Sequence, residues 1–171
     1  MLFRSVTKYL YGATDAKSAL YGEGANMVNT VGAYRTIVSV VVAFILPFAA
    51  AKMGRKYVHA ICLTLGGLAL ISTKYLPDPS WLGIAAIGLG FAWSSILTMP
   101  YAMLTNVLPA KRMGYFVGVF NFFIVLPQIV AGMFSKFYLQ AIGGDSMTAI
   151  TIGGISFILA GLLALRVQDK G

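Results

Sequence analysis

The sequence predicts an all-α integral membrane protein with about five transmembrane helices. Hydrophobic residues make up 58% of the 171 residues and charged residues only 11%, whereas about a quarter of the residues of a soluble globular domain are charged. Too few polar side chains are present to cover a surface in water, so the apolar excess requires lipid. Helices are expected because the apolar runs lack the alternation of barrel strands and because backbone groups in lipid must bond internally.

Five apolar segments are long enough to cross the hydrocarbon core of a bilayer, which takes about 20 helical residues. Short polar stretches separate them, so residues 28–171 are expected to form one five-helix bundle. The predicted spans cover approximately residues 28–51, 57–75, 81–104, 113–137 and 147–165.

The basic residues are concentrated in alternate connections between these spans. One set of connections, with the carboxyl-terminal tail, carries Lys52, Arg55, Lys56, Lys111, Arg112, Arg166 and Lys170. The other set carries Lys74 and Lys136 together with Asp78 and Asp145. The positive-inside rule predicts that the first set and the carboxyl terminus are cytoplasmic. The segment before residue 28 would then lie outside, although it contains three basic residues, against the rule.

Several functional classes are disfavoured by the sequence. The net charge of +8 comes from basic residues in short gaps, without the continuous basic stripe that nucleic-acid binding requires, so no nucleic-acid partner is expected. Cys62 is the single cysteine and lies in an apolar run, where it is interpreted as a small residue that faces lipid or packs between helices. No phosphate-binding glycine loop, carboxylate pair or Ser-His-Asp set is found. We therefore expect no enzymatic activity, no cofactor and no metal site.

Arg35 is the most informative single residue, because it lies about two turns inside the first predicted span. A charge at the centre of a membrane helix costs about 2.5 to 3.5 kcal/mol on insertion scales and must be compensated. Two interpretations remain open: Arg35 binds a substrate or counter-ion in a cavity, or it snorkels outward toward Glu23. His59, at a predicted membrane edge, is interpreted as an interfacial histidine.

The third span carries hydroxyl groups along one side, since Ser94, Thr98, Tyr101 and Thr105 follow one another at three- and four-residue steps. Trp93 lies beside them. Hydroxyls next to an aromatic ring suit a polyhydroxylated ligand, which needs hydrogen bonds for its alcohols and a flat surface for its apolar face. The alternative is that the Ser and Thr side chains only bond to their own helix backbone.

The fourth span has a stripe of small and polar residues at helical spacing. The stripe consists of Gly114, Gly118, Asn121, Val125, Gln128, Gly132 and Ser135. Such a stripe favours contact with protein or water over lipid. It predicts either close helix packing at Gly114 and Gly118 with Asn121 and Gln128 as hydrogen-bonding groups between helices, or the lining of a substrate path.

Two stretches resemble a known family. KMGRK, residues 52–56, resembles the second copy of the loop motif of the major facilitator superfamily, between helices eight and nine. The run GLGFAWSSILTMPYAMLTNVLPAKRMGYFVGVFNFFIVLPQIV, residues 88–130, resembles helices ten and eleven of its sucrose-transporter branch, which is akin to the glycoside, pentoside and hexuronide cation symporters. YLYGATDAKSALYGEGANMVN, residues 9–29, is similar to the external loop before helix eight.

The resemblance implies that the five spans are helices eight to twelve of a twelve-helix transporter, and that residues 1–27 hold the end of helix seven and an external loop. The complete protein would then be a symporter of a disaccharide or related glycoside with protons or another cation, in a bacterial-type inner membrane. Its partners would be the sugar, the coupling ion, the lipid bilayer and the amino-terminal half that this chain lacks. Lys52, Gly54, Arg55 and Lys56 would help to hold the cytoplasmic gate.

Under this interpretation the substrate path would include Arg35, Trp93, Ser94, Thr98, Tyr101, Asn121 and Gln128. The competing hypothesis is a non-transporting membrane interaction or assembly protein, in which the small-residue stripes bind partner helices.

Overall fold

The computed structural model describes residues 11–12, 15, 17–76, 78 and 81–167, and over these residues it is helical and contains no strand. Its long helices are α2 (Ala19–Met53), α3 (Arg55–Ser72), α4 (Leu82–Thr105), α5 (Met113–Ala141) and α6 (Ser146–Ala164). All five are long and apolar enough to cross a membrane. The predicted class, an all-α membrane protein with five transmembrane helices, is therefore confirmed.

The first long helix starts earlier than the sequence suggested. Residues up to 27 were expected to be a loop, but α2 is helical from Ala19 onward. The reason is local, because Ser18 is extended and its hydroxyl accepts a hydrogen bond from the Tyr21 N–H at 3.2 Å, which caps the helix. The predicted end of a preceding helix, in the first ten residues, lies outside the described residues.

Two short connections depend on glycine or on capping. Gly54 alone separates α2 from α3, with φ +88° and ψ 144°, a conformation that only glycine adopts without strain. At the start of α6, the Asp145 carboxylate accepts hydrogen bonds from the N–H groups of Met147 and Thr148 at 3.0 and 3.1 Å. Asp145 thus has a structural role that a count of loop charges does not reveal.

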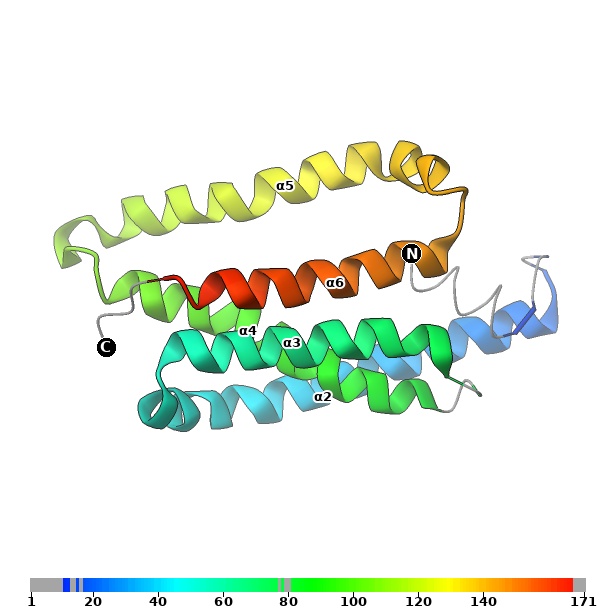
Figure 1. Cartoon of the computed structure of the whole chain (residues 1–171), viewed down its shortest axis with the longest axis horizontal. Helices are drawn as coiled ribbons and strands as arrows, with labels where there is room; N and C mark the ends of the chain where they lie inside the picture. The colour runs from blue at the N-terminus through cyan, green and yellow to red at the C-terminus, as the bar shows by residue number, and fades with distance from the viewer. Residues whose placement is uncertain (1–10, 13–14, 16, 77, 79–80, 168–171) are drawn as a thin grey trace.

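Helix α3 is the centre of the bundle, since it packs against both α4 and α6, while α2 packs against α4 (Figure 1). The largest buried apolar cluster joins residues of α2, α3 and α4, namely Val42, Leu46, Val58, Cys62 and Met99. Cys62 therefore packs between helices, one of the two alternatives considered for it. A second cluster, Val31, Leu82 and Ala86, joins α2 to the start of α4.

Glycines allow the backbones of α3 and α6 to touch. A Cβ atom added to Gly67 would lie 2.5 Å from the carbonyl oxygen of Gly154, and one added to Gly154 would lie 2.6 Å from the carbonyl oxygen of Gly67. Membrane helices associate mainly through such close van der Waals packing, because lipid supplies no hydrophobic drive between them. The sequence analysis did not identify this pair of glycines.

Helix α5 lies apart from the other four helices (Figure 1). None of its residues is buried, and a Cβ atom on Gly114, Gly118 or Gly132 would meet nothing within 4 Å. The described part of this chain therefore holds no close partner for Gly114 and Gly118, and the close packing considered for this stripe stays a prediction. Because α5 meets α4 chiefly near the connection between them, its stripe is left open.

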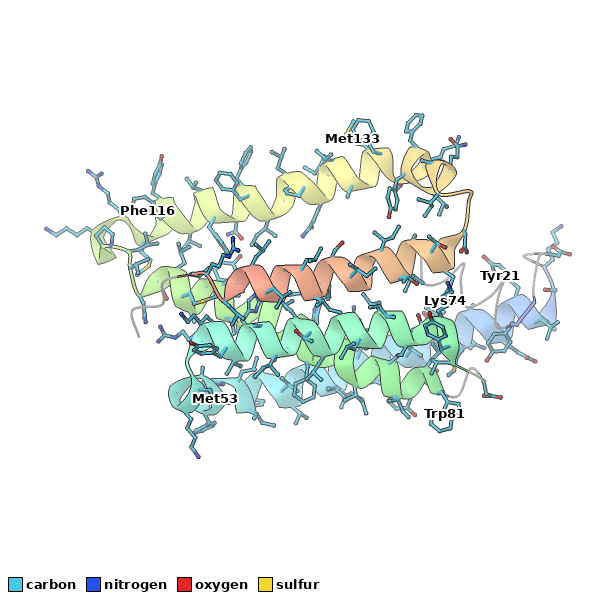
Figure 2. All side chains as sticks on the ribbon, in the orientation of Figure 1. Tyr21, Met53, Lys74, Trp81, Phe116 and Met133 are labelled. Carbon is cyan, nitrogen blue, oxygen red and sulfur yellow. The ribbon has the colours of Figure 1, made fainter. Side chains whose placement is uncertain are left out.

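The connections fall into two groups at opposite ends of the bundle. Met53, beside the α2–α3 connection, and Phe116, near the start of α5, lie at one end, and Lys74 and Trp81 lie at the other (Figure 2). The first end carries the described basic residues Lys52, Arg55, Lys56, Lys111, Arg112 and Arg166. The connections that alternate in charge along the sequence therefore lie at opposite ends of one bundle.

Candidate functional site

Arg35 of α2 and Trp93 of α4 contact each other across a close helix crossing. The crossing is at Gly90, where a Cβ atom would lie 3.0 Å from the carbonyl oxygen of Arg35 and 2.7 Å from Cβ of Val38. Because the helices approach so closely, the Arg35 guanidinium carbon reaches 4.8 Å from the centroid of the Trp93 ring. This is cation–π geometry, which is stabilising within about 6 Å. We call Arg35 and Trp93 the Arg–Trp pair.

Trp93 lies near the middle of α4, whereas Arg35 lies about one turn past Val31, the α2 residue that packs against the start of α4. The Arg–Trp pair therefore lies inside the bundle, level with residues 90–93 of α4. Glu23 is roughly 18 Å away along α2, at 1.5 Å per helical residue. That separation is too long for an ion pair, so the structure argues against outward snorkelling toward Glu23. The Nε atom of Arg35 is buried and has no hydrogen-bond partner among the described residues.

The hydroxyl groups of α4 have different roles. Thr98 donates to the carbonyl oxygen of Ser94 at 2.8 Å, and Thr105 donates to that of Ala102 at 3.3 Å. For these two threonines the alternative of backbone bonding within the helix therefore holds. Ser94 is 2% exposed, and its hydroxyl has no hydrogen-bond partner in the described part of the chain.

Tyr101 connects α4 to α5. Its hydroxyl donates a hydrogen bond to Oδ1 of Asn121, and its ring meets that of Phe120 edge to face, with centroids 5.2 Å apart. Asn121 thus acts as a hydrogen-bonding group between helices, one of the two roles considered for it. Gln128, two turns further along α5, is exposed and not part of this contact.

We expect Tyr101→Phe to lower the free energy of unfolding by about 0.6 to 1.7 kcal/mol, the range for hydrogen bonds between membrane helices. The ring contact with Phe120 is kept, so only the hydrogen bond is lost. Thermal unfolding in detergent of Tyr101→Phe, Asn121→Ala and the double variant measures the coupling energy between the Tyr101 and Asn121 side chains. Tyr115→Phe, at an exposed tyrosine of α5, is the control. Fully additive effects would show that the hydrogen bond does not stabilise the protein.

His59 lies in the second turn of α3, at the predicted membrane edge, and it is buried against α4. It is only 8% exposed, and its Nδ1 lies 2.8 Å from the hydroxyl oxygen of Ser95 on α4. A buried ring nitrogen requires such a partner, since an unpaired one costs about 1 to 3 kcal/mol. Hydrogen bonding within the α3–α4 interface therefore explains the position of His59. The sequence feature that could have indicated a buried partner for His59 is the face of small residues on α4, which includes Ser94 and Ser95.

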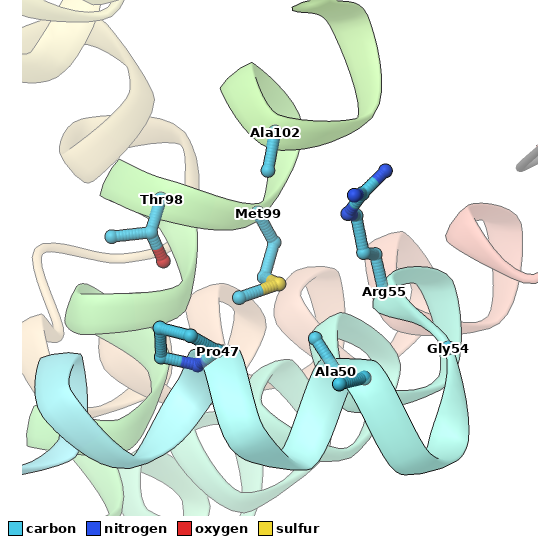
Figure 3. Close-up of a pocket in the computed structure, with 8 residues that line it drawn as sticks. Pro47, Ala50, Gly54, Arg55, Thr98, Met99 and Ala102 are labelled. Atoms are coloured by element: carbon cyan, nitrogen blue, oxygen red, sulfur yellow. The ribbon is translucent and has the colours of Figure 1, made fainter. Parts of the chain in front are cut away.

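The predicted gate loop borders a cavity between α2 and α4. The cavity has a volume of about 510 Å³. Its lining includes Pro47, Ala50, Gly54, Arg55, Thr98, Met99 and Ala102 (Figure 3). With the Asn106 amide oxygen turned toward it, Arg55 donates from Nη2 at 3.0 Å, which connects the start of α3 to the end of α4. Asn106 was not predicted.

The two lysines of the gate loop are placed differently from Arg55. Lys52 is exposed at the end of α2. The ammonium nitrogen of Lys56 lies 5.3 Å from the ring centroid of Tyr57. Of the four predicted gate residues, Gly54 and Arg55 therefore line the cavity and the lysines do not.

These features define the class of the protein: a polytopic α-helical membrane protein with an arginine and polar side chains inside its helical layer. Comparison with known proteins shows similarity to transporters of the major facilitator superfamily (MFS) type. Two MFS-type transporters of Pseudomonas aeruginosa, strains LESB58 and PAO1, are each 27% identical over 114 residues, which is 64% of this chain and 28% of the relative. The niacin transporter NiaP of Acinetobacter baylyi is 25% identical over 119 residues, 70% of this chain and 27% of that protein.

The chain therefore spans less than a third of the length of these curated relatives. All three relatives are named as transporters and none as an enzyme, in agreement with the prediction that this chain is not an enzyme. No family model matches the chain, and no solved structure matches it.

Proposed function

We propose that this chain forms part of a secondary transporter of the MFS type, in which α2 to α6 correspond to helices eight to twelve. The observation that carries the proposal is the Arg–Trp pair inside the bundle, where Trp93 lies near the middle of α4. Substrate sites of secondary transporters lie near the bilayer midplane, and an arginine at that depth is costly unless it has a function. The transporter relatives support the same conclusion.

The resemblance to the sucrose-transporter branch favours a sugar, such as a disaccharide or related glycoside, coupled to protons or another cation. Trp93, Tyr101 and Asn121 offer the flat surface and the hydrogen-bonding groups that a sugar needs. Ser94, Thr98 and Gln128 complete the proposed substrate path. The described acidic residues all lie before α2, α4 and α6 or in the first two turns of these helices, so the coupling acid would come from residues outside the described part of this chain.

The proposed orientation places the end with Lys52, Lys111 and Arg166 in the cytoplasm of a bacterial-type inner membrane, in accordance with the positive-inside rule. Gly54 and Arg55, with the lysines beside them, would then form part of a cytoplasmic gate. The Arg55–Asn106 contact supports this role, because it holds the α2–α3 connection against the end of α4 on one side of the cavity.

A non-transporting interaction protein remains the second candidate, and α5 is the observation that favours it. An apolar helix with no buried residue and an open stripe of small residues has the composition of a helix that binds partner helices. The same helix would serve a transporter by packing against the half of the protein that this chain lacks.

Uptake by sealed vesicles containing the protein from the complete reading frame tests the proposal. We expect saturable accumulation of a labelled solute that an imposed proton or sodium gradient drives and that an ionophore abolishes. A panel of disaccharides and glycosides tests the sugar hypothesis, and Asn121→Ala tests the substrate path, since it should weaken sugar affinity. Correct membrane insertion without uptake of any solute would favour the interaction protein.

A further inference from the structure

The charge of Arg35 is not compensated within the described bundle. A guanidinium stays protonated at any physiological pH. The described acidic residues are Asp15, Glu23, Asp78 and Asp145, which lie before α2, α4 and α6 or in their first two turns. These three helices start at the end of the bundle opposite Met53 (Figures 1 and 2). Arg35 is partly exposed, and its contact with Trp93 offsets only part of the cost of placing a cation among membrane helices. An anion must therefore approach Arg35 from outside these helices.

The geometry of the Arg–Trp pair favours a carboxylate as that anion. Trp93 fixes the guanidinium from one side, and the planar fork of N–H donors then matches the two oxygens of a carboxylate. Arg35 as a whole is partly exposed although its Nε is buried, so the terminal N–H groups are the donors that an entering anion would meet. Trp93 is 45% exposed, so its ring offers a flat apolar surface next to the charge.

From these observations we propose that the Arg–Trp pair binds the carboxylate of a small organic acid with a flat apolar body, and that such acids are the substrates of the transporter. This proposal rests on the proposed transport function. It is an alternative to the sugar, which rests on the resemblance, and the ligand pairs below decide between the two. A neutral sugar would leave the Arg35 charge uncompensated inside the helical bundle, whereas a carboxylate neutralises it and forms charge-assisted hydrogen bonds. Trp93 would contact the apolar body of the acid.

The test uses two pairs of ligands that differ in one group. Benzoate and benzamide share a ring and differ in charge, and glucuronate and glucose form the corresponding pair for a carboxylated sugar. Thermal unfolding of the complete protein in detergent, over a concentration series of each ligand, gives the dissociation constants. We expect stabilisation by benzoate but not by benzamide, and weaker or no stabilisation by glucuronate.

Variants of Arg35 identify the carboxylate-binding group. Arg35→Gln should weaken benzoate binding roughly 10- to 100-fold, the usual effect of losing a hydrogen bond to a charged group. Arg35→Lys keeps the charge without the planar fork and should fall between the two. Arg112→Gln, at an exposed arginine beside α5, is the matched control and should bind benzoate as the wild type does.

Equal stabilisation by benzoate and benzamide, unchanged benzoate binding in Arg35→Gln, or no stabilisation by either carboxylate would each overturn the proposal. If Arg35→Gln lowered the unfolding temperature of the ligand-free protein but had no effect on benzoate binding, Arg35 would pair with an acidic side chain elsewhere in the protein. That result would also overturn the proposal. Binding of glucuronate but not of benzoate would show that the ligand does not need a flat apolar body. Arg35-dependent benzoate binding without any vesicle uptake would support this inference while contradicting the proposed transport function.

Discussion

Gly154→Leu is expected to destabilise the protein more than any other single substitution considered for this chain. The new Cβ atom would lie 2.6 Å from the carbonyl oxygen of Gly67, and Ile71 and Leu70 of α3 are also closer than 3.2 Å. Overpacking typically costs about 1 to 3 kcal/mol, and here a backbone blocks the new side chain, so we expect a loss of about 3 kcal/mol or more. Thermal unfolding in detergent measures this loss.

Gly153→Leu is the matched control, because it introduces the same side chain one residue earlier on α6. A Cβ atom on Gly153 would meet only Cδ1 of Leu70, at 4.0 Å. We expect this variant to unfold within about 1 kcal/mol of the wild type, since the added side chain has room. Equal destabilisation by both variants would mean that α6 does not pack on α3 through the Gly67–Gly154 contact.

Gly90→Leu is expected to have the second largest effect, and it acts on the site as well as on stability. The substitution places a Cβ atom 2.6 Å from Cγ1 of Val38 and 3.0 Å from the carbonyl oxygen of Arg35, which forces α2 away from α4. Separation of the two helices removes the contact between Arg35 and Trp93. We expect a loss of stability of about 1 to 3 kcal/mol and a loss of uptake of roughly tenfold or more.

Gly83→Leu is the control on the same helix, since a Cβ atom there would meet nothing within 4 Å. Uptake and unfolding temperature should both stay close to wild type in this variant. If Gly90→Leu kept wild-type uptake at wild-type stability, the α2–α4 crossing would not be what positions the Arg–Trp pair.

The membrane-spanning helices could be predicted from the sequence because their cause is local. Each apolar run is long enough to cross a bilayer, and lipid leaves a single segment no alternative to the helix. The start of α2 was missed because one capping serine extends the helix into a polar segment. Capping depends on a single side chain and does not change the hydropathy of the run.

The candidate site could be predicted only in part. Arg35 and Trp93 stood out by residue type, one as a charge inside a span and the other as an aromatic ring beside hydroxyls, but no sequence pattern placed them together. Asn106 and the buried pair of His59 and Ser95 were missed, because each takes its role from a partner on another helix.

The sequence by itself determined that lipid surrounds this protein, how many times the chain spans the membrane and how charge alternates between the connections. These properties depend on composition and on neighbours along the chain. Only the tertiary structure decided that Gly67, Gly90 and Gly154 are the contact glycines while those of α5 are open. The physical reason is that a glycine brings helices together only where a second backbone lies opposite it, and the packing of α3, α4 and α6 determines where that occurs.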